Sequence, residues 1–338
     1  MFRLRGIATL AGLCTLLSGS PAIAWDGPGH MAIAGLAYDQ LSASEKSKLA
    51  TVMTAFSDKQ RLVDDLNTPS PSPRDLVMAG ATWPDLIKQD PGFTGRHDYD
   101  EPGPLIKVEE SKVMHVGWHF IDTPFHSETG VDGPPLDGSK VNIVEVLSVL
   151  DAQLKSHESA AERAYDTIWL LHLVGDIHQP LHCASNFDTN NPTGDVGGNN
   201  VTVTDDISGA KELHGYWDDI LGKPAPRDRI TKKLRLDRDV VRANSIIAAI
   251  GTQTLPADAD TIDFAAWAKH SHALAVNDVY KQIDLTTILV HKDGDDMPAD
   301  SATLDENYHN LATDDAQQQV YLAGHRLALL LKKYLAAM

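Results

Sequence analysis

Apolar residues recur at helical spacing along most of this 338-residue chain, and this periodicity restricts its fold more than any other feature. In Ser44–Phe56, for example, Leu49, Val52 and Phe56 fall on one face of a helix. Such faces are buried by packing helices against one another. Similar patterns predict helices over Met31–Tyr38, Pro73–Gly80, Val141–Lys155, Ala160–Ile177, Leu234–Gly251, Asp263–Val279 and Asp314–Ala337.

The sequence therefore predicts an all-α fold, that is, a single mostly helical domain with long loops and at most a short β-hairpin. Val201–Thr204 alternates as a short strand would. Long loops inside a compact domain often carry a functional site. Three segments rich in Gly, Pro and Asp are expected to form such loops: Pro91–Pro104, Thr123–Ser139 and Ala184–Gly198.

The first 24 residues have the three parts of a secretory leader. Arg3 and Arg5 give a positive start, the apolar run Ile7–Leu17 follows, and Pro21–Ala24 offers small residues for cleavage. The apolar run is too short to span a bilayer, and no later stretch is long enough. We therefore expect export to the periplasm or the medium, with residues 25–338 as one domain and no membrane contact after the leader is removed.

Removal of the leader would leave 27 basic and 47 acidic residues, a net charge of −20, because the leader holds two of the 29 basic residues and no acidic ones. A surface of this sign repels nucleic acid. A polynucleotide could therefore bind only where positive charge is concentrated locally, and bound metal ions can supply that charge. Cys14 lies in the leader, so Cys183 has no partner for a disulfide and is expected to be a small buried residue.

The segment His172–His182 concentrates residues of the types that bind metal ions. On a helix, His172 and Asp176 are four residues apart and lie on the same face, so both can contact one ion. Pro180 is expected to end or bend this helix and to direct His182 towards a second metal position. Imidazole and carboxylate groups together suit zinc, and a carboxylate can bridge two ions.

The same spacing of four recurs in His214-Gly-Tyr-Trp-Asp218. Two other segments add single candidates: Asp85 follows a predicted helix, and His119 lies in a run, Trp118–Asp122, that is expected to be extended. One pair at this spacing is most often a solvated helix face. Two pairs, together with a histidine-rich turn, predict a metal site.

The start of the expected mature chain, Trp25-Asp-Gly-Pro-Gly-His30, supplies a further candidate. A free amino group can bind zinc, and the neighbouring carbonyl oxygen can complete a five-membered chelate ring. The glycines and the proline permit a tight turn that brings His30 back beside Trp25. Because the same nitrogen is an amide while the leader is attached, export would also activate the protein.

In this order, the motifs resemble those of the zinc-dependent single-strand-specific nucleases of fungi, plants and bacteria, the family of mung bean nuclease and nuclease P-one. The resemblance covers the whole mature chain, through His172–His182 and the turn Gly197-Gly198-Asn199 to Ala323–Ala328 in the last helix. It implies that residues 25–338 form one catalytic nuclease domain with the helical fold that this family shares with zinc phospholipase C. Eukaryotic members of the family carry disulfides, and this chain cannot form one within itself, so it resembles a bacterial member.

The resemblance implies three zinc ions per chain. Asp176 would bridge two of them, whereas His178 would only donate or accept a hydrogen bond beside the site. The implied ligands are Asp85, His119, His172 and Asp176 for one ion; His182, His214 and Asp218 for a second; and the amine and carbonyl of Trp25, His30 and the far oxygen of Asp176 for the third.

The resemblance also implies a secreted endonuclease that hydrolyses single-stranded DNA and RNA to 5′-phosphate products, with 3′-nucleotidase activity. A zinc-bridged water or hydroxide would attack phosphorus in line. Phe120 would stack on a base that Asn199 contacts, and such stacking favours unpaired bases. The implied partners are single-stranded nucleic acid and nucleotides; no protein partner is implied, and a monomer is expected.

Two features leave room for other interpretations. Many relatives carry an acidic residue after the Thr-Pro that follows His-Phe-Ile-Asp, but here Phe125 and His126 stand there, so Asp122 is the expected carboxylate near the attacking water. Phe120 could instead be a core aromatic.

Two other functions compete with the nuclease. A zinc-dependent phospholipase C has a similar fold and cluster, but those enzymes close the last pair with glutamate and place the early histidine further from the tryptophan. Asp218 and the short spacing from Trp25 to His30 therefore favour the nuclease. A non-catalytic periplasmic zinc-binding protein would fill every coordination position with protein groups, whereas this set leaves room for water. A zincin protease is disfavoured because the chain contains no His-Glu-x-x-His.

Overall fold

The computed structural model describes residues 25–87, 93, 95–97, 112–127, 129, 133, 134, 136, 141–156, 159–231, 233–292 and 295–338. The expected leader, residues 1–24, lies outside the described residues, as does most of the expected loop Pro91–Pro104. In the part that is described, no helix combines the length and the apolar character needed to cross a membrane.

The expectation of a mostly helical fold is confirmed. Pro73–Gly80 has the predicted bounds, and Ala160–Asp176 ends one residue before the predicted boundary. The α-helices among the described residues are α1 (Gly27–Asp39), α2 (Ala43–Thr54), α3 (Lys59–Asp65), α4 (Pro73–Gly80), α5 (Trp83–Leu86), α6 (Ile143–Gln153), α7 (Ala160–Asp176), α8 (Leu213–Asp219), α9 (Leu236–Ile250), α10 (Phe264–Leu274) and α11 (Glu306–Ala336).

Helix α7 is the central element of the core. It begins with a capping box, in which the Ser159 side chain accepts from the Glu162 backbone and the Glu162 side chain accepts from the Ser159 backbone. Every residue from Ala164 to Asp176 is buried. Because a helix buried all round needs neighbours on every side, α7 contacts α1, α2, α5, α6 and α11. The polar residues at its end are therefore enclosed by other helices.

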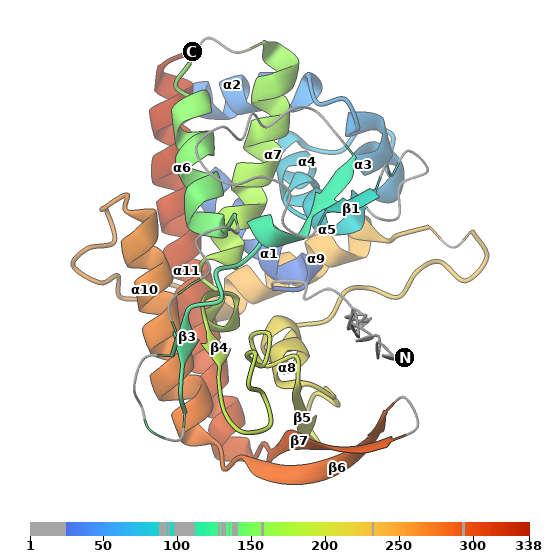
Figure 1. Cartoon of the computed structure of the whole chain (residues 1–338). Helices are drawn as coiled ribbons and strands as arrows, with labels where there is room; N and C mark the ends of the chain where they lie inside the picture. Colours follow the sequence, from blue (N-terminus) through green and yellow to red (C-terminus); the bar gives the residue numbers. More distant parts are fainter. Residues whose placement is uncertain are drawn as a thin grey trace, which may run out of the picture.

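Helix α1 packs closely against α11, which runs along most of the length of the molecule (Figure 1). A Cβ atom on Gly324 would lie 2.7 Å from Leu36 Cβ, and one on Gly35 would lie 2.9 Å from Ile247 Cδ1. Glycine at these positions allows α1 to approach α11 and α9. This packing fixes the helix that carries His30.

Three small sheets accompany the helices in the described residues. The predicted strand Val201–Thr204 is present as β5, and it lies parallel to one strand of the hairpin β6–β7 at one end of the molecule (Figure 1). The hairpin is polar along its second strand, which contains Pro298, so it shows no clear apolar alternation in the sequence. The three-stranded sheet consists of β5, β6 (Thr286–Lys292) and β7 (Asp295–Thr303). The other strands form two parallel pairs: β1 (Gly95–His97) with β2 (Val113–His115), and β3 (Pro124–Phe125) with β4 (Ser185–Asn186).

Most helix boundaries differ from the prediction by a few residues, and the two largest differences lie in α10 and α11. The segment expected as one helix over Asp263–Val279 changes at Ala275 into one turn of π-helix. Helix α11 begins at Glu306, eight residues before the predicted start, because the Asp305 side chain caps it by accepting from the Tyr308 backbone. Neither difference alters the helical character of the chain.

Candidate metal centre

The last turn of α7 carries the first pair of candidate ligands. His172 and Asp176 are fully buried, and His172 Nε2 lies 3.3 Å from Asp176 Oδ2. His172 Nδ1 donates to the backbone carbonyl of Ala81 at 2.8 Å, which fixes the ring and leaves Nε2 facing the carboxylate. The spacing of four residues therefore brings both groups to one point, as the sequence predicts.

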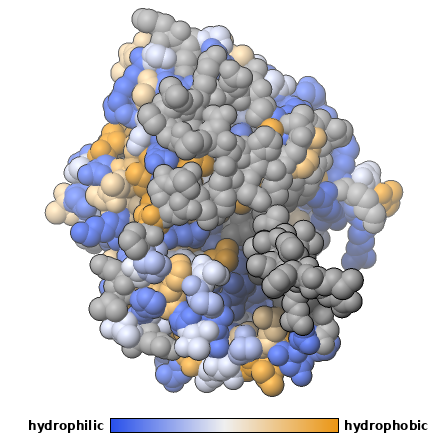
Figure 2. Space-filling model, in the orientation of Figure 1, coloured by the Kyte–Doolittle hydropathy of each residue, from blue (hydrophilic) through white to orange (hydrophobic). Residues whose placement is uncertain are grey.

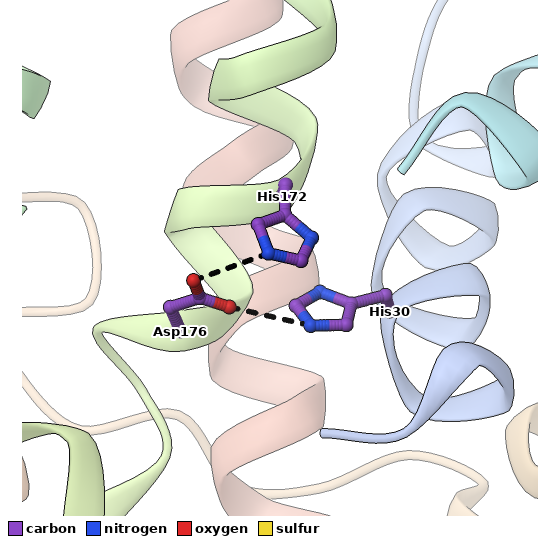
Figure 3. A group of neighbouring side chains, drawn as sticks. All are labelled: His30, His172 and Asp176. Atoms are coloured by element: carbon purple, nitrogen blue, oxygen red, sulfur yellow. Dashed lines mark ion pairs between the residues drawn. The ribbon is translucent and has the colours of Figure 1, made fainter. Parts of the chain in front are cut away.

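Helix α1 brings His30 to the other oxygen of the same carboxylate (Figure 3). His30 Nε2 lies 3.2 Å from Asp176 Oδ1, and the rings of His30 and His172 stack with centroids 4.0 Å apart. A Cβ atom on Gly175 would lie only 2.7 Å from His30 Nδ1. Glycine at this position in α7 therefore makes the space that His30 occupies.

A second group shares His172 and adds residues from two other segments. His119 Nδ1 lies 2.9 Å from Asp176 Oδ2, and Asp85 Oδ1 lies 3.6 Å from His172 Nε2. Asp85 follows α4, as predicted, and lies within a further short helix, α5. The prediction for His119 was wrong: it follows a 3₁₀ turn, Val116–Trp118, and has helical backbone angles instead of extended ones.

The third group is formed by His182, His214 and Asp218, all of them buried. Helix α7 ends at Asp176, and a 3₁₀ turn that starts at Pro180 carries His182, in agreement with the predicted effect of the proline. His214 and Asp218 come from α8, with His214 Nε2 3.5 Å from Asp218 Oδ2.

Each of the three groups offers ligand atoms that lie within 4.8 Å of one another. Together they contain eight of the nine predicted ligands. The groups are His30, His172 and Asp176; Asp85, His119 and His172; and His182, His214 and Asp218.

The hydrogen bonds of the third group indicate a cation. His182 Nδ1 donates to the His119 carbonyl and His214 Nδ1 donates to the Gly197 carbonyl, each at 2.7 Å. In the neutral rings, both Nε2 atoms are then acceptors, yet they lie 3.2 Å apart. Two lone pairs at this distance repel unless a positive ion lies between them. Histidine metal ligands commonly donate their second nitrogen to a carbonyl in this way.

Buried polar atoms without hydrogen bonds mark the first two groups. Among the described residues, both ring nitrogens of His30, Nε2 of His119 and Oδ1 of Asp176 make no hydrogen bond. Buried polar atoms are nearly always satisfied, so such a concentration at one point calls for a missing partner. Imidazole nitrogens and carboxylate oxygens are the donors that zinc takes, and the residues fit that ion.

The buried histidines of the third group are held neutral. Burial lowers the pKa of His182 to about 4, and burial together with the neighbouring His182 lowers the pKa of His214 to about 3. Burial likewise holds the pKa of His30 well below its usual range. A neutral imidazole keeps the lone pair that a metal ion requires.

His172 behaves differently because two carboxylates face it. Burial opposes its protonation, but the charges of Asp176 and Asp85 outweigh burial and raise its pKa to about 9. In the third group, burial and the charge of Asp26 raise the pKa of Asp218 well above its usual range. A bound cation would reverse both effects, since it favours the deprotonated form of each ligand.

Trp25 belongs to none of the three groups of side chains. It is buried, and a Cβ atom on Gly29 would lie 2.7 Å from its own Cβ. The Asp26 amide donates to the Asp218 carbonyl at 3.1 Å, which ties this end of the described chain to α8. The predicted glycine turn is instead the first turn of α1, where Pro28 is tolerated because the early amides of a helix have no intrahelical partner.

The predicted substrate residues lie on two neighbouring segments. Phe120 and Asp122 are half-buried and follow His119, and the Ile121 amide between them donates to the His182 carbonyl at 2.8 Å. Asn199 is half-buried, and its side-chain amide donates to the Val196 carbonyl at 2.7 Å. Phe120 and Asp122 therefore lie close in sequence to the ligand candidate His119, while the side chain of Asn199 is held within its own turn.

His178 and Cys183 lie outside the metal groups. His178 Nδ1 donates to the Val174 carbonyl at 2.7 Å, and its Nε2 accepts from Arg326 at 2.9 Å, so both nitrogens are used. Cys183 is fully buried, as predicted, and burial raises the pKa of its thiol. An un-ionised buried thiol is not a nucleophile.

Sequence reasoning missed several residues that support the site. Gln179 donates to Asp218 Oδ1 at 2.8 Å and accepts from the Leu181 amide. Its position between His178 and Pro180 is the only sequence signal for this role. Asp195 accepts from the Asn186 amide at 2.9 Å and from the Tyr280 hydroxyl, and burial raises its pKa to about 7. Both residues hold the turns that present metal-binding groups.

Comparison with known proteins agrees with the arrangement of the site. Residues 25–336 match the family profile described as S1/P1 Nuclease. The chain is also similar to "Endonuclease 1" of Arabidopsis thaliana, at 24% identity over 338 residues that cover 95% of this chain and 90% of the relative. Since the match extends over almost the whole described chain and includes all three groups, the chain belongs to the S1/P1 nuclease family.

Proposed function

We propose that this nuclease hydrolyses the phosphodiester bonds of single-stranded DNA and RNA to 5′-phosphate products, with three zinc ions held by the buried groups. The observation that carries the proposal is the burial of three His/Asp groups, two of which share His172 in the last turn of one buried helix. The family membership supports phosphodiester hydrolysis, and the name of the Arabidopsis relative supports internal cleavage. Removal of a terminal phosphate from 3′-nucleotides is proposed on the same chemistry.

The geometry supports these ligand roles. Asp176 would link two ions, because Oδ1 faces His30 while Oδ2 faces His119 and His172. When bound, zinc supplies Lewis acidity towards a phosphate oxygen and towards water. His182, His214 and Asp218 would hold the remaining ion, with Gln179 orienting the Asp218 carboxylate.

The residues around the groups would position the substrate. Phe120 offers an aromatic ring on which an unpaired base can stack, and the Asn199 turn offers polar groups for that base. Asp122 would hold the attacking water by accepting a hydrogen bond from it. Duplex bases are already stacked on each other, so this arrangement favours single strands.

We further propose that the expected leader keeps the enzyme inactive until export. The amine and carbonyl of Trp25 would complete the group of His30 and Asp176, and only a free N-terminus provides that amine. The resulting product would be one catalytic domain over residues 25–338, located in the periplasm or the medium, and active as a monomer.

The test compares the chain that begins at Trp25 with a variant that carries one extra residue before it. Both are assayed for zinc content and for cleavage of single-stranded DNA, RNA, duplex DNA, a 3′-nucleotide and a choline phospholipid. We expect cleavage of single strands by the first chain, and about one zinc ion less with lost activity in the variant. Exclusive lipid cleavage would show a phospholipase, zinc binding without any hydrolysis would show a storage protein, and full activity of the variant would remove the terminal ligand.

A further inference from the structure

One segment of this acidic protein is strongly basic. Residues 223–242, here called the basic arm, contain eight basic and three acidic residues, a net charge of +5 in a chain whose net charge is −18. The arm joins α8 to α9 and includes the first turns of α9. It projects from the body of the molecule on the right of Figure 1, where Figure 2 shows a largely hydrophilic surface.

The acidic residues of the arm serve its own structure. The Asp228 side chain accepts from the Ile230 and Thr231 amides, which closes a turn whose tip residue, Ile230, is 91% exposed. Asp239 accepts from the Ala225 amide at 2.6 Å and anchors the start of the arm on α9.

The remaining acidic residue, Asp237, pairs with Arg235 through two short hydrogen bonds. In the described part of the chain, the side chains of Arg229, Lys233 and Arg238 are exposed and make no ion pair. Three cations are thus exposed to solvent and outside close ion pairs, although Lys233 lies near Asp65 and Arg238 near Asp237, in a molecule whose acidic residues outnumber its basic ones.

The arm starts at the metal centre. Helix α8, which carries His214 and Asp218, leads directly into it, and Lys223 Nζ lies 2.8 Å from Asp219 Oδ2. The Asp219 carboxyl is in turn hydrogen-bonded to that of Asp26, next to Trp25. A strand whose phosphate lies in the metal centre can therefore reach the arm with its neighbouring nucleotides.

Midway along its length the arm meets an open groove. Lys233 lines this groove of about 770 Å³ together with residues of α2, α3 and the segment before α4. The groove has the size of a small-molecule site, and its lining includes a second cation, Lys59, one anion, Asp64, and polar groups of Asn67 and Ser70. A second cation outside the arm therefore lies close to Lys233.

We infer that the basic arm binds the phosphate backbone of the single-stranded nucleic acid whose cleaved bond lies in the metal centre. The inference rests on the proposed function. It explains how an acidic enzyme can attract an anionic polymer. Lysine and arginine bind phosphates through charge and release the ions condensed on them, so such binding weakens with salt. Short substrates, which end within the metal centre, do not contact the arm.

The test uses the zinc-loaded enzyme and the triple variant Arg229→Gln, Lys233→Gln and Arg238→Gln. The matched control, Lys46→Gln, Lys269→Gln and Lys281→Gln, removes the same charge from α2, α10 and the turn after α10. For a single-stranded DNA of about 20 nucleotides, we expect KM to rise about tenfold in the arm variant at low salt. The dependence of log KM on log salt should fall by about 2, since each phosphate contact contributes about 0.7. Cleavage of a dinucleotide should stay unchanged in both variants.

Each outcome decides one question. Unchanged KM and salt dependence on the long strand, or an equal loss on the dinucleotide, would overturn the role of the arm while leaving the nuclease intact. Equal effects in the arm variant and the control would show that only the net charge of the protein matters, and this result would also overturn the role of the arm. If the arm variant lost binding to anionic phospholipid vesicles but not to DNA, the partner would be a lipid surface. Failure of the unmodified enzyme to cleave any nucleic acid would contradict the proposed function itself.

Discussion

The metal centre contains the same sequence pattern twice, in two very different structural settings. His172 and Asp176 lie in α7, a helix of 17 residues whose last 13 are all buried. His214 and Asp218 have the same spacing in α8, which has only seven residues and no side-chain cap. The first pair is positioned by the helix and the core around it, whereas the second depends on contacts with neighbouring turns.

The supporting contacts show this difference in detail. His214 is oriented by the carbonyl of Gly197, a glycine with a positive φ of 59° in the expected loop Ala184–Gly198. Asp218 is held by Gln179 from the turn after α7. An i, i+4 pair therefore predicts which residues converge, but a short helix needs partners from elsewhere to hold them there. We expect the two groups to respond differently to substitution.

The largest effect is expected from Asp176, because its two oxygens serve two groups. Asp176→Asn should lower kcat/KM on single-stranded DNA by at least about 1,000-fold and remove close to two zinc ions, since an amide is a poor bridging ligand. Asp218→Asn is the comparison and should remove about one ion. Zinc content and single-strand cleavage are measured for both. Equal losses of metal would show that Asp176 does not bridge.

The third group should be sensitive to the turn that supports it. A Cβ atom on Gly197 would lie 2.4 Å from the Leu181 carbonyl, so Gly197→Ala should shift the carbonyl that orients His214. We expect activity to fall about 10–100-fold with a loss of about one zinc ion. Gly209→Ala is the matched control, because Gly209 also has a positive φ but has open space around it. Similar losses in both variants would assign the effect to backbone strain alone.

A smaller effect is expected at the contact between α7 and α1. Gly175→Ala places a methyl group against His30 and should displace that ring, which lowers activity about tenfold. Gly215→Ala, in α8 and without a close neighbour, is the control and should raise stability by up to about 1 kcal/mol. Thermal unfolding and zinc content distinguish the two. Normal zinc content in the Gly175 variant would show that the space is not needed for His30.

The pH dependence of metal binding should also separate the groups. His172 has a pKa of about 9 without metal, so a proton must leave before an ion binds, and affinity there should rise with pH up to about 9. His182 and His214, with pKa values of about 4 and 3, are already neutral above pH 5, so in the third group only the raised pKa of Asp218 makes binding depend on pH. In the stripped Asp218→Asn variant, which lacks that carboxyl, the zinc affinity of the remaining groups should still be higher at pH 8 than at pH 6. An affinity that does not change with pH in this variant would contradict the raised pKa of His172.

The sequence predicts the helices and the pairs His172/Asp176 and His214/Asp218 because both depend on local spacing, whereas the resemblance to the family was needed to group Asp85 and His119 with them. Amphipathic periodicity located α4 and α7 closely, and the proline after α7 predicted the turn at His182. The supports were not predictable, because they join segments far apart in the chain. The Ala81 carbonyl that orients His172 is 91 residues away from it in the sequence. No local sequence pattern shows which of the many backbone carbonyls will accept from a given histidine.

The two incorrect details have the same cause. The backbone at His119 and the start of α1 are set by contacts with α7 and α8, which override local preferences for extended structure or a turn. The hairpin β6–β7 escaped prediction because pairing, not apolar alternation, stabilises it. The roles of Trp25, Phe120, Asp122 and Asn199 stay predictions, to be tested on the processed enzyme.

The most direct test is a zinc titration of the processed chain after complete removal of metal by a chelator. The stripped protein should not cleave single-stranded DNA, and activity should return as bound zinc approaches three ions per chain, with no activity at the first equivalent. Full cleavage by the stripped protein, or saturation of activity at one ion, would contradict a centre built from three cooperating groups.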